Sequence, residues 1–171
     1  MDDEPLLFTP LIGQAGTPIS AWPSALPDAL AASFHPPQGV NIAVGIDIIE
    51  VERVRRTLAQ HGERFLQRIY TAQEIEQCRG KAIKLAGRFA AKEAISKALG
   101  TGMRGISWHE LEVVQLSTGR PTVRLYGNAR LRAEQLNLSA CDVSISDLAQ
   151  FSIAVAVAVQ TTCAADINEE K

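Results

Sequence analysis

The chain has 171 residues, of which 46% are hydrophobic and 21% charged, a composition typical of a soluble globular protein with room for one domain and a tail. A net charge of −2 argues against general nucleic-acid binding, and no apolar run approaches the roughly 20 residues of a membrane-spanning helix. The three cysteines show no ligand spacing, which argues against a zinc site or a disulfide framework and, with the acidic N-terminal residues, favours a cytoplasmic location.

Residues 1–39 are predicted to be an extension that precedes the folded domain. They contain seven of the eight prolines, four acidic residues and no lysine or arginine, and repeated X-Pro steps disfavour a helix. We expect a loosely ordered segment, which is either a dispensable tail or a regulatory arm. The folded domain is expected over 40–162 and a C-terminal tail over 163–171.

From residue 40 onward, β-rich runs alternate with helical patterns. Gly62 is predicted to end the first helix, and Thr71 with Glu74 forms a candidate capping box at the start of the second. The two β-rich runs that flank the sequence STGR predict a hairpin. In chain order, the expected elements are a strand over 41–48, helices over 51–62, from 71 and over 81–100, a hairpin over 111–127, a helix over 128–137, and strands over 141–146 and 151–160.

The last of these strands has two different apolar faces. Large side chains alternate with serine and alanine over 151–159, and successive residues of a strand point to opposite sides of a sheet. Both faces should therefore be covered, the alanine face by a helix or by a neighbouring subunit. The order of elements predicts an α+β fold, with a largely antiparallel sheet and helices packed on it.

The alanine-rich helix over 81–100 carries more charge than packing requires. Glu93 is either half of a surface i,i+4 pair with Lys97 or a metal ligand. Arg88 and Lys92 are also four apart and repel each other slightly, which favours an anion nearby. Asp47, near the end of the first strand, is by itself best explained as a helix cap or turn residue. Two carboxylates with room for water nevertheless suit Mg²⁺ acting on phosphates, so the residues alone predict a magnesium-phosphate site without naming a reaction.

Two long motifs carry a family resemblance. The stretch VGIDIIEVERV over 44–54 and the stretch GRFAAKEAISKALGTG over 87–102 resemble, in order and spacing, the signature of the holo-acyl-carrier-protein synthases, the small phosphopantetheinyl transferases. GISW, STGRP and VSIS…IAVAVA also match, so the resemblance spans roughly 42–160. It implies transfer of 4′-phosphopantetheine from coenzyme A to a serine of an apo acyl carrier protein. It also implies a homotrimer with the site between subunits, in which a neighbour would cover the alanine face of 152–158.

The resemblance assigns roles to individual residues by matching position. Asp47 and Glu93 become the magnesium ligands, and Glu93 is also placed to take the proton of the carrier serine, directly or through a water. Lys97 would steady the pyrophosphate as adenosine 3′,5′-bisphosphate leaves. The other implied coenzyme A contacts are Arg88, Arg79 and Lys81 at the 3′-phosphate, Gly119, Arg120 and Pro121 in place of the family's G-K-P turn, and Ser144 and Ser146.

The partner implied by the resemblance is a strongly acidic carrier protein. The first helix offers basic residues, which are either its docking surface or an ordinary solvated helix face. These are Arg53, Arg56 and Arg64, followed by Arg68. One departure is Asp147, which stands where many relatives have histidine. The alternative functions are a non-catalytic coenzyme A-binding module or an oligomerisation module; the complete acid pair with Lys97 favours the enzyme. The implied carrier serves either fatty-acid or polyketide synthesis.

Overall fold

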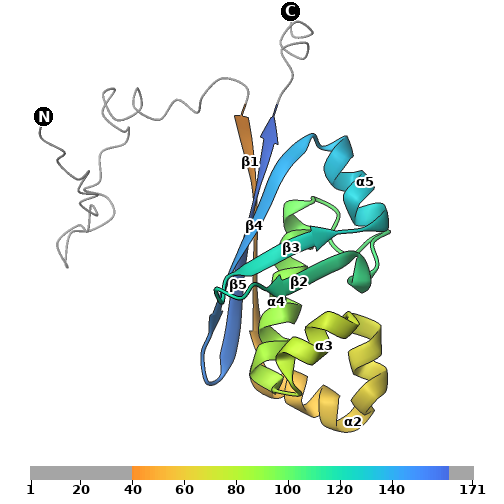
Figure 1. Ribbon diagram of the computed structural model, residues 1–171, viewed down its shortest axis with the longest axis vertical. Helices are drawn as coiled ribbons and strands as arrows, with labels where there is room; N and C mark the ends of the chain where they lie inside the picture. The colour runs from red at the N-terminus through yellow and green to blue at the C-terminus, as the bar shows by residue number, and fades with distance from the viewer. Residues whose placement is uncertain (1–39, 162–171) are drawn as a thin grey trace, which may run out of the picture. The chain divides into compact units, whose positions relative to one another are not determined.

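The computed structural model describes residues 40–161 (Figure 1). The expected extension over 1–39 and the expected tail over 163–171 lie outside the described residues. The elements of the described part are β1 (Val40–Glu50), α2 (Val51–Ile69), α3 (Ala72–Cys78), α4 (Ala82–Ala98), the 3₁₀ helix η2 (Trp108–Glu110), β2 (Leu111–Gln115), β3 (Pro121–Leu125), α5 (Gly127–Gln135), β4 (Leu138–Asp147) and β5 (Phe151–Thr161). Within this part, no helix combines the length and apolar character needed to cross a bilayer.

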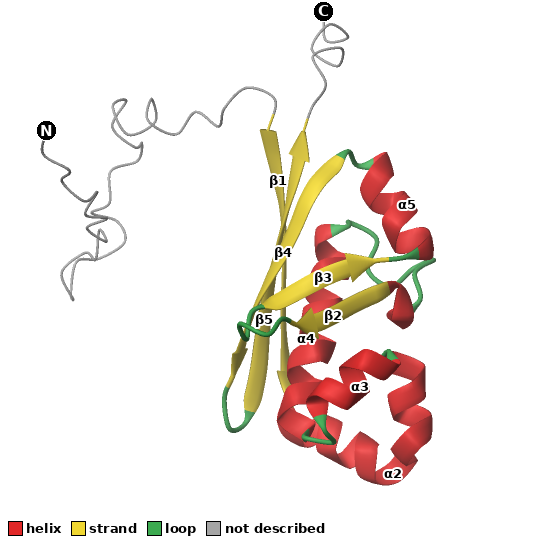
Figure 2. Ribbon diagram, viewed as in Figure 1, coloured by secondary structure: helices red, strands yellow, loops and turns green. Residues whose placement is uncertain are grey.

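A three-stranded antiparallel sheet in the order β1-β5-β4 supports the domain, and β2 and β3 form a separate hairpin (Figure 2). Helix α4 packs on the sheet through small side chains, because the alanines of α4 from Ala86 onward and those of β5 are almost fully buried where the two elements meet. A Cβ atom at Gly45 of β1 would lie 1.9 Å from the carbonyl oxygen of Ala94. Only glycine therefore permits this approach of strand and helix. The expected α+β fold with a largely antiparallel sheet is confirmed.

Local start and stop patterns have mixed outcomes. The capping box of α3 is confirmed, because the Thr71 hydroxyl accepts a hydrogen bond from the Glu74 amide and the Glu74 carboxylate accepts one from the Thr71 amide. The expected end of the first helix at Gly62 is wrong in part. The chain kinks there, with φ 49° and ψ −129°, and then continues as helix to Ile69. A left-handed φ suits glycine and here redirects the helix without ending it.

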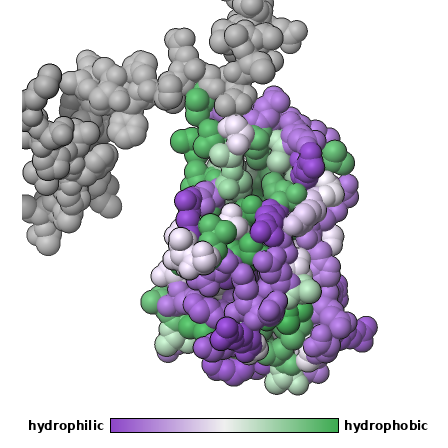
Figure 3. All heavy atoms as spheres, in the orientation of Figure 1, coloured by the Kyte–Doolittle hydropathy of each residue, from purple (hydrophilic) through white to green (hydrophobic). Residues whose placement is uncertain are grey.

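The two faces of the sheet differ in what covers them. Helix α4 covers the face that carries Ala154, Ala156 and Ala158, which are at most 1% exposed, so the expectation that a neighbouring subunit covers this face is wrong. The opposite face is apolar and open. Its β1 side chains, Ile42, Val44, Ile46 and Ile48, are between 58% and 65% exposed. Hydrophobic residues are visible along the side of the domain where β1 runs (Figure 3).

Candidate active site

Strand β1 and helix α4 bring together the two carboxylates that the sequence singled out. Asp47 pairs in register with Ala154 of β5, so its side chain lies on the α4 face of the sheet. There the Lys97 ammonium donates to the Asp47 carboxylate at 2.9 Å and to the Ile46 carbonyl at 2.8 Å. The Asp47 side chain is 19% exposed and that of Lys97 48%. This pair is open to solvent on the lysine side.

Glu93 is half-buried beside this pair. Burial raises the pKa of its carboxyl, the nearby Asp47 charge raises it further, and Lys97 opposes both effects. Within residues 40–161, the Glu93 carboxylate makes no hydrogen bond or ion pair. Lys97 thus pairs with Asp47, and the surface pair of Glu93 with Lys97 that the helical spacing offered does not form.

The chemistry of these donors fits a magnesium ion. Mg²⁺ keeps several waters and takes one or two protein carboxylates, and Asp47 and Glu93 supply two. No group of three or more acidic, histidine or cysteine ligands gathers in the part of the chain that the structure describes, so a site for a more fully protein-coordinated metal is not found there. The Lys97 ammonium held by Asp47 indicates that this carboxylate attracts a cation.

A second feature is a pocket of about 610 Å³ between α3, the start of α4 and the end of β2. Four cationic side chains line it against one acid, Glu76. The cations are Arg79, Lys81, Lys84 and Arg88. Arg88 is only 5% exposed, and its Nε has no hydrogen-bond partner among residues 40–161. A buried unpaired donor beside three further cations points to an anionic ligand.

The acid pair and the cationic pocket do not meet within one chain. Arg88 and Glu93 are five residues apart on α4, which places them about 140° apart around the helix axis. Ser144 and Ser146 are separate again, because their register partners Val155 and Ile153 lie on the sheet face that is turned away from α4. The structure thus divides the set of residues expected to bind coenzyme A into groups on different sides of α4 and of the sheet.

The β2–β3 turn holds Gly119, Arg120 and Pro121. Gly119 has φ 89°, a conformation that requires glycine. The Arg120 guanidinium forms an ion pair with Asp142 of β4. The side-chain amide of Gln115 donates to the Gly119 carbonyl at 2.6 Å, so the end of β2 holds the turn directly.

Asp147 lies beside the cationic pocket. Its carboxylate accepts from the Lys84 ammonium at 2.9 Å and from the Ser152 hydroxyl at 3.0 Å. Lys84 itself lines the pocket. The aspartate therefore pairs with a lysine at the edge of this pocket, and this lysine was not among the expected site residues.

Three arginines of α2, Arg53, Arg64 and Arg68, lie around two adjoining cavities with apolar side chains in their lining, which together form the groove of α2. A cavity of about 580 Å³ is lined by Arg64, Arg68, Phe65 and Trp108, among others. It shares Phe65 with a smaller cavity of about 150 Å³ that Arg53 lines. Arg53 and Arg64 thus lie around neighbouring cavities. The third expected arginine, Arg56, lines neither cavity and pairs with Glu52 at 3.4 Å.

Lys92 corrects one reading of the sequence. The spacing of Arg88 and Lys92 predicted a shared anion nearby. The anion at Lys92 is the carboxylate of Glu74, at 2.8 Å, and both side chains are 0% exposed. Burial lowers the pKa of Lys92, and the Glu74 charge opposes that shift. Lys92 therefore belongs to the core of the domain, and only Arg88 of this pair reaches the pocket.

The comparisons with known proteins agree with this geometry. A family model described as "4'-phosphopantetheinyl transferase superfamily" matches residues 43–156. The chain belongs to this family. Among its relatives, a holo-[acyl-carrier-protein] synthase of Koribacter versatilis is 44% identical over 117 residues, which cover 66% of this chain and 94% of the relative. The recognition of this family from the two sequence motifs is thus confirmed, and the transferase class with it.

Solved structures of the family resemble this domain as well. Holo-[acyl-carrier-protein] synthase of Helicobacter pylori, in complex with coenzyme A, is 32% identical with a TM-score of 0.62, over 67% of this chain and 98% of that one. The Neisseria meningitidis synthase is 36% identical with a TM-score of 0.61, over 68% of this chain and 96% of that one. Neither the magnesium ion nor the trimer follows from these comparisons, and both remain predictions.

Proposed function

We propose that Asp47, Glu93 and Lys97 carry out phosphopantetheine transfer, with Mg²⁺ held between the two carboxylates. The chain is a transferase of the holo-[acyl-carrier-protein] synthase type: it moves 4′-phosphopantetheine from coenzyme A to a serine of an apo acyl carrier protein and releases adenosine 3′,5′-bisphosphate. The observation that supports the assignment is the convergence of these side chains at the family's motif positions. A half-buried carboxylate without a hydrogen bond is costly, which disfavours a purely structural or binding module.

Each residue has a defined task in this mechanism. Glu93 accepts the proton of the serine Oγ, because its half-buried carboxylate has no hydrogen-bond partner among residues 40–161. The serine oxygen forms a bond to the phosphorus that carries pantetheine, while the bond from that phosphorus to the bridging oxygen breaks. Lys97 Nζ donates to the oxygens of the departing bisphosphate. Bound Mg²⁺ would supply neutralisation of the charge that develops on the pyrophosphate.

The second part of the proposal is that copies of this chain share each site. The acid pair and the cationic pocket face different sides of α4, so one coenzyme A meets both sets when a second copy brings its pocket to the first copy's carboxylates. The open apolar face of β1, β5 and β4 offers the surface for this contact, since exposed patches of this kind mark interaction sites. Ser144 and Ser146 lie on that same face. A homotrimer, as in the family, fits both observations.

The carrier protein is proposed to dock on the groove of α2. Its floor contains Phe89 and Trp108, whose rings lie 4.8 Å apart between centroids, and its rim carries Arg53 and Arg64. An apolar floor with a basic rim suits an acidic partner, because rim charges steer encounter and the floor contributes burial. Phe89 lies one helical turn before Glu93, so a carrier bound here would reach the acid pair. We also propose that the protein is located in the cytoplasm.

The decisive experiment incubates the full chain with coenzyme A, Mg²⁺ and an apo acyl carrier protein and measures the mass of the carrier. The expected result is a gain equal to one phosphopantetheine group, lost when EDTA replaces Mg²⁺. If none of the apo acyl carrier proteins tested gains this mass, the proposed function is wrong. Activity that persists in EDTA would overturn the magnesium assignment alone.

Two matched pairs of variants test the surfaces. Arg64→Glu should raise the KM for carrier protein roughly tenfold, whereas Arg130→Glu on α5 should not. Val44→Arg should reduce the mass found by light scattering to that of a monomer, whereas Leu131→Arg, at an exposed leucine of α5, should leave it unchanged. Equal effects within a pair would remove the surface concerned from the proposal.

A further inference from the structure

The cationic pocket has two walls that come from different parts of the chain. One wall is α3 with the turn into α4. The other is the end of β2, which contributes Gln115 and Leu116. The hairpin β2–β3 is a separate sheet that shares no strand with the main one. The width of the pocket therefore depends in part on how α3 holds β2, beside the contacts that the hairpin makes with α4 and β4.

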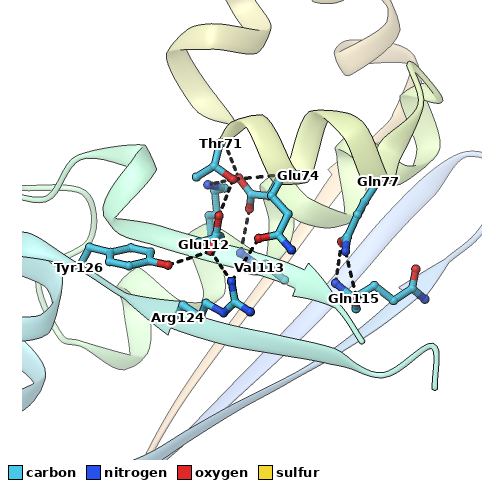
Figure 4. Close-up of polar contacts among 10 residues, drawn as sticks. Thr71, Glu74, Gln77, Glu112, Val113, Gln115, Arg124 and Tyr126 are labelled. Carbon is cyan, nitrogen blue, oxygen red and sulfur yellow. Dashed lines mark hydrogen bonds and ion pairs between the residues drawn. The ribbon is translucent and has the colours of Figure 1, made fainter. Parts of the chain in front are cut away.

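Side chains of α3 take the place of a neighbouring strand along the free edge of β2 (Figure 4). Gln77 accepts from the Gln115 amide at 2.7 Å and donates to the Gln115 carbonyl at 2.9 Å. One turn earlier, the Glu74 carboxylate accepts from the Val113 amide at 2.8 Å. Backbone groups at a strand edge need such partners, and one face of α3 supplies them with side chains.

Glu74 is the buried member of the set of α3 side chains that bond to β2. Its carboxylate accepts from the amides of Val113 and Thr71 and pairs with Lys92 of α4, each at 2.8 Å, and it is 0% exposed. The Thr71 hydroxyl donates to Glu112 of β2 at 2.7 Å. These contacts join α3, α4 and β2 away from solvent. Of the α3 side chains that bond to the backbone of β2, Gln77 is the one that lines the pocket.

Gln115 connects α3 to the β2–β3 turn through hydrogen bonds to both. Its backbone is held by Gln77, and its side-chain amide donates to the Gly119 carbonyl at 2.6 Å. Arg120 follows directly after Gly119. A shift of β2 relative to α3 would therefore move the backbone of the turn, and the Arg120 side chain would then have to follow it or give up its ion pair with Asp142 of β4.

We propose that Gln77 is a positioning residue for coenzyme A: by holding the backbone of Gln115, it sets the hairpin wall and Arg120 at the distance from α3 that the phosphates require. This inference rests on the proposed function. Gln77 takes no part in the transfer of the phosphoryl group or of a proton. Its contribution is to hold a wall of the pocket in place.

The test compares Gln77→Ala with Gln73→Ala in the full-length protein. Gln73 is the matched control, because it is on the same helix and lines the same pocket, but it accepts from the Arg124 side chain of β3 at 3.1 Å and does not bond to the backbone of β2. Loss of two neutral hydrogen bonds predicts a roughly tenfold higher KM for coenzyme A in Gln77→Ala, with kcat nearly unchanged. Gln73→Ala should change the KM by less than about threefold.

A double-mutant cycle with Arg120→Ala separates positioning from direct contact. If Gln77 acts through the turn, the rise in KM caused by Gln77→Ala is smaller once Arg120 is gone, whereas Gln73→Ala and Arg120→Ala add independently. Hydrogen exchange gives a readout without coenzyme A: the amide of Gln115 should exchange faster in Gln77→Ala, whereas the amide of Val113, which Glu74 holds, and those of β5 should not.

The outcomes distinguish this inference from the proposed function. A wild-type chain that transfers nothing overturns both. An active wild type with an unchanged KM in Gln77→Ala, or with additive effects of Gln77→Ala and Arg120→Ala, overturns the inference alone. Unchanged exchange at Gln115 overturns it as well, because the strand edge would then be held by other contacts.

Discussion

Helix α4 carries two lysine–carboxylate pairs of almost the same length and very different surroundings. Lys92 and Glu74 are 2.8 Å apart with both side chains fully buried, and Lys97 and Asp47 are 2.9 Å apart with Lys97 nearly half exposed. In the buried pair both charged groups have further partners within the protein. Lys92 also donates to the Trp108 carbonyl at 2.8 Å, and Glu74 accepts from two backbone amides. The exposed pair has water on one side. The first can only hold the fold, whereas the second can exchange partners when ligands arrive.

The largest expected effect concerns the exposed pair and its neighbour. Asp47→Asn and Glu93→Gln should each lower turnover roughly a thousandfold, because each removes a charge at the centre of the reaction. Neither opens a cavity, so the free energy of unfolding should change by less than about 1 kcal/mol. Steady-state kinetics at saturating Mg²⁺ and urea unfolding check both statements. Near-normal turnover in either variant would refute its role.

The buried pair should give the opposite result. Lys92→Met leaves the Glu74 carboxylate buried without its cation and should cost about 3–5 kcal/mol of unfolding free energy. The double variant Lys92→Met with Glu74→Gln should recover part of this, since glutamine still accepts from the Val113 amide. Urea unfolding measures all three proteins. A loss as small as that of an exposed pair would mean that solvent reaches this part of the core.

A moderate effect is expected when the lysine of the exposed pair is removed. Lys97→Ala should lower turnover about ten- to a hundredfold, because the leaving bisphosphate loses a donor. Its stability should fall by less than about 1 kcal/mol, as for other exposed ion pairs. Thermal melts and kinetics on the same sample make the comparison. A lower melting temperature with unchanged kinetics would assign Lys97 to the fold.

A smaller effect is expected at Glu112, which lies beside the buried pair. Burial raises the pKa of this carboxyl, but hydrogen bonds from Thr71, Tyr126 and Arg124 outweigh burial and hold it below its usual value of 4.5. A depressed folded pKa contributes stability above the unfolded value, which is lost as pH falls through the folded one. Glu112→Gln should therefore flatten the loss of stability below about pH 4.5. Thermal melts between about pH 3 and 6 test this, and an unchanged acid slope would contradict it.

The smallest effect is expected from deletion of residues 1–39, which should leave both pairs and kcat unchanged because both motifs begin after Val40. The four acids of this segment offer one exception. If they compete with the carrier for the arginines of α2, deletion lowers the KM for carrier at low salt and less so at high salt. Kinetics at two salt concentrations measure this, and a collapse of kcat would show that the segment is part of the working domain.

Local patterns in the sequence predicted most of the fold. The Thr71–Glu74 capping box, the hairpin and the alternation of β5 each depend on residues a few positions apart. The strand–helix contact that unites Asp47 with Glu93 depends on residues 46 positions apart, and the family motifs, not their spacing alone, identified it. The role of Lys92 was missed for the same reason: its partner Glu74 lies on another helix, and no local pattern reveals which lysine of α4 turns inward.

The geometry of the active site depends on the absence of a side chain at Gly45 of β1. This glycine lies two residues before Asp47 on the same face of the strand, and it contacts the backbone of Ala94, the residue after Glu93. The contact between Gly45 and α4 therefore sets both the packing of the strand on the helix and the distance between the two carboxylates. Any side chain at position 45 would push β1 away from α4, because its Cβ would lie 1.9 Å from the Ala94 carbonyl oxygen. The core contact and the distance between the carboxylates would then change together, and a substitution at Asp47 or Glu93 alone would not restore the packing.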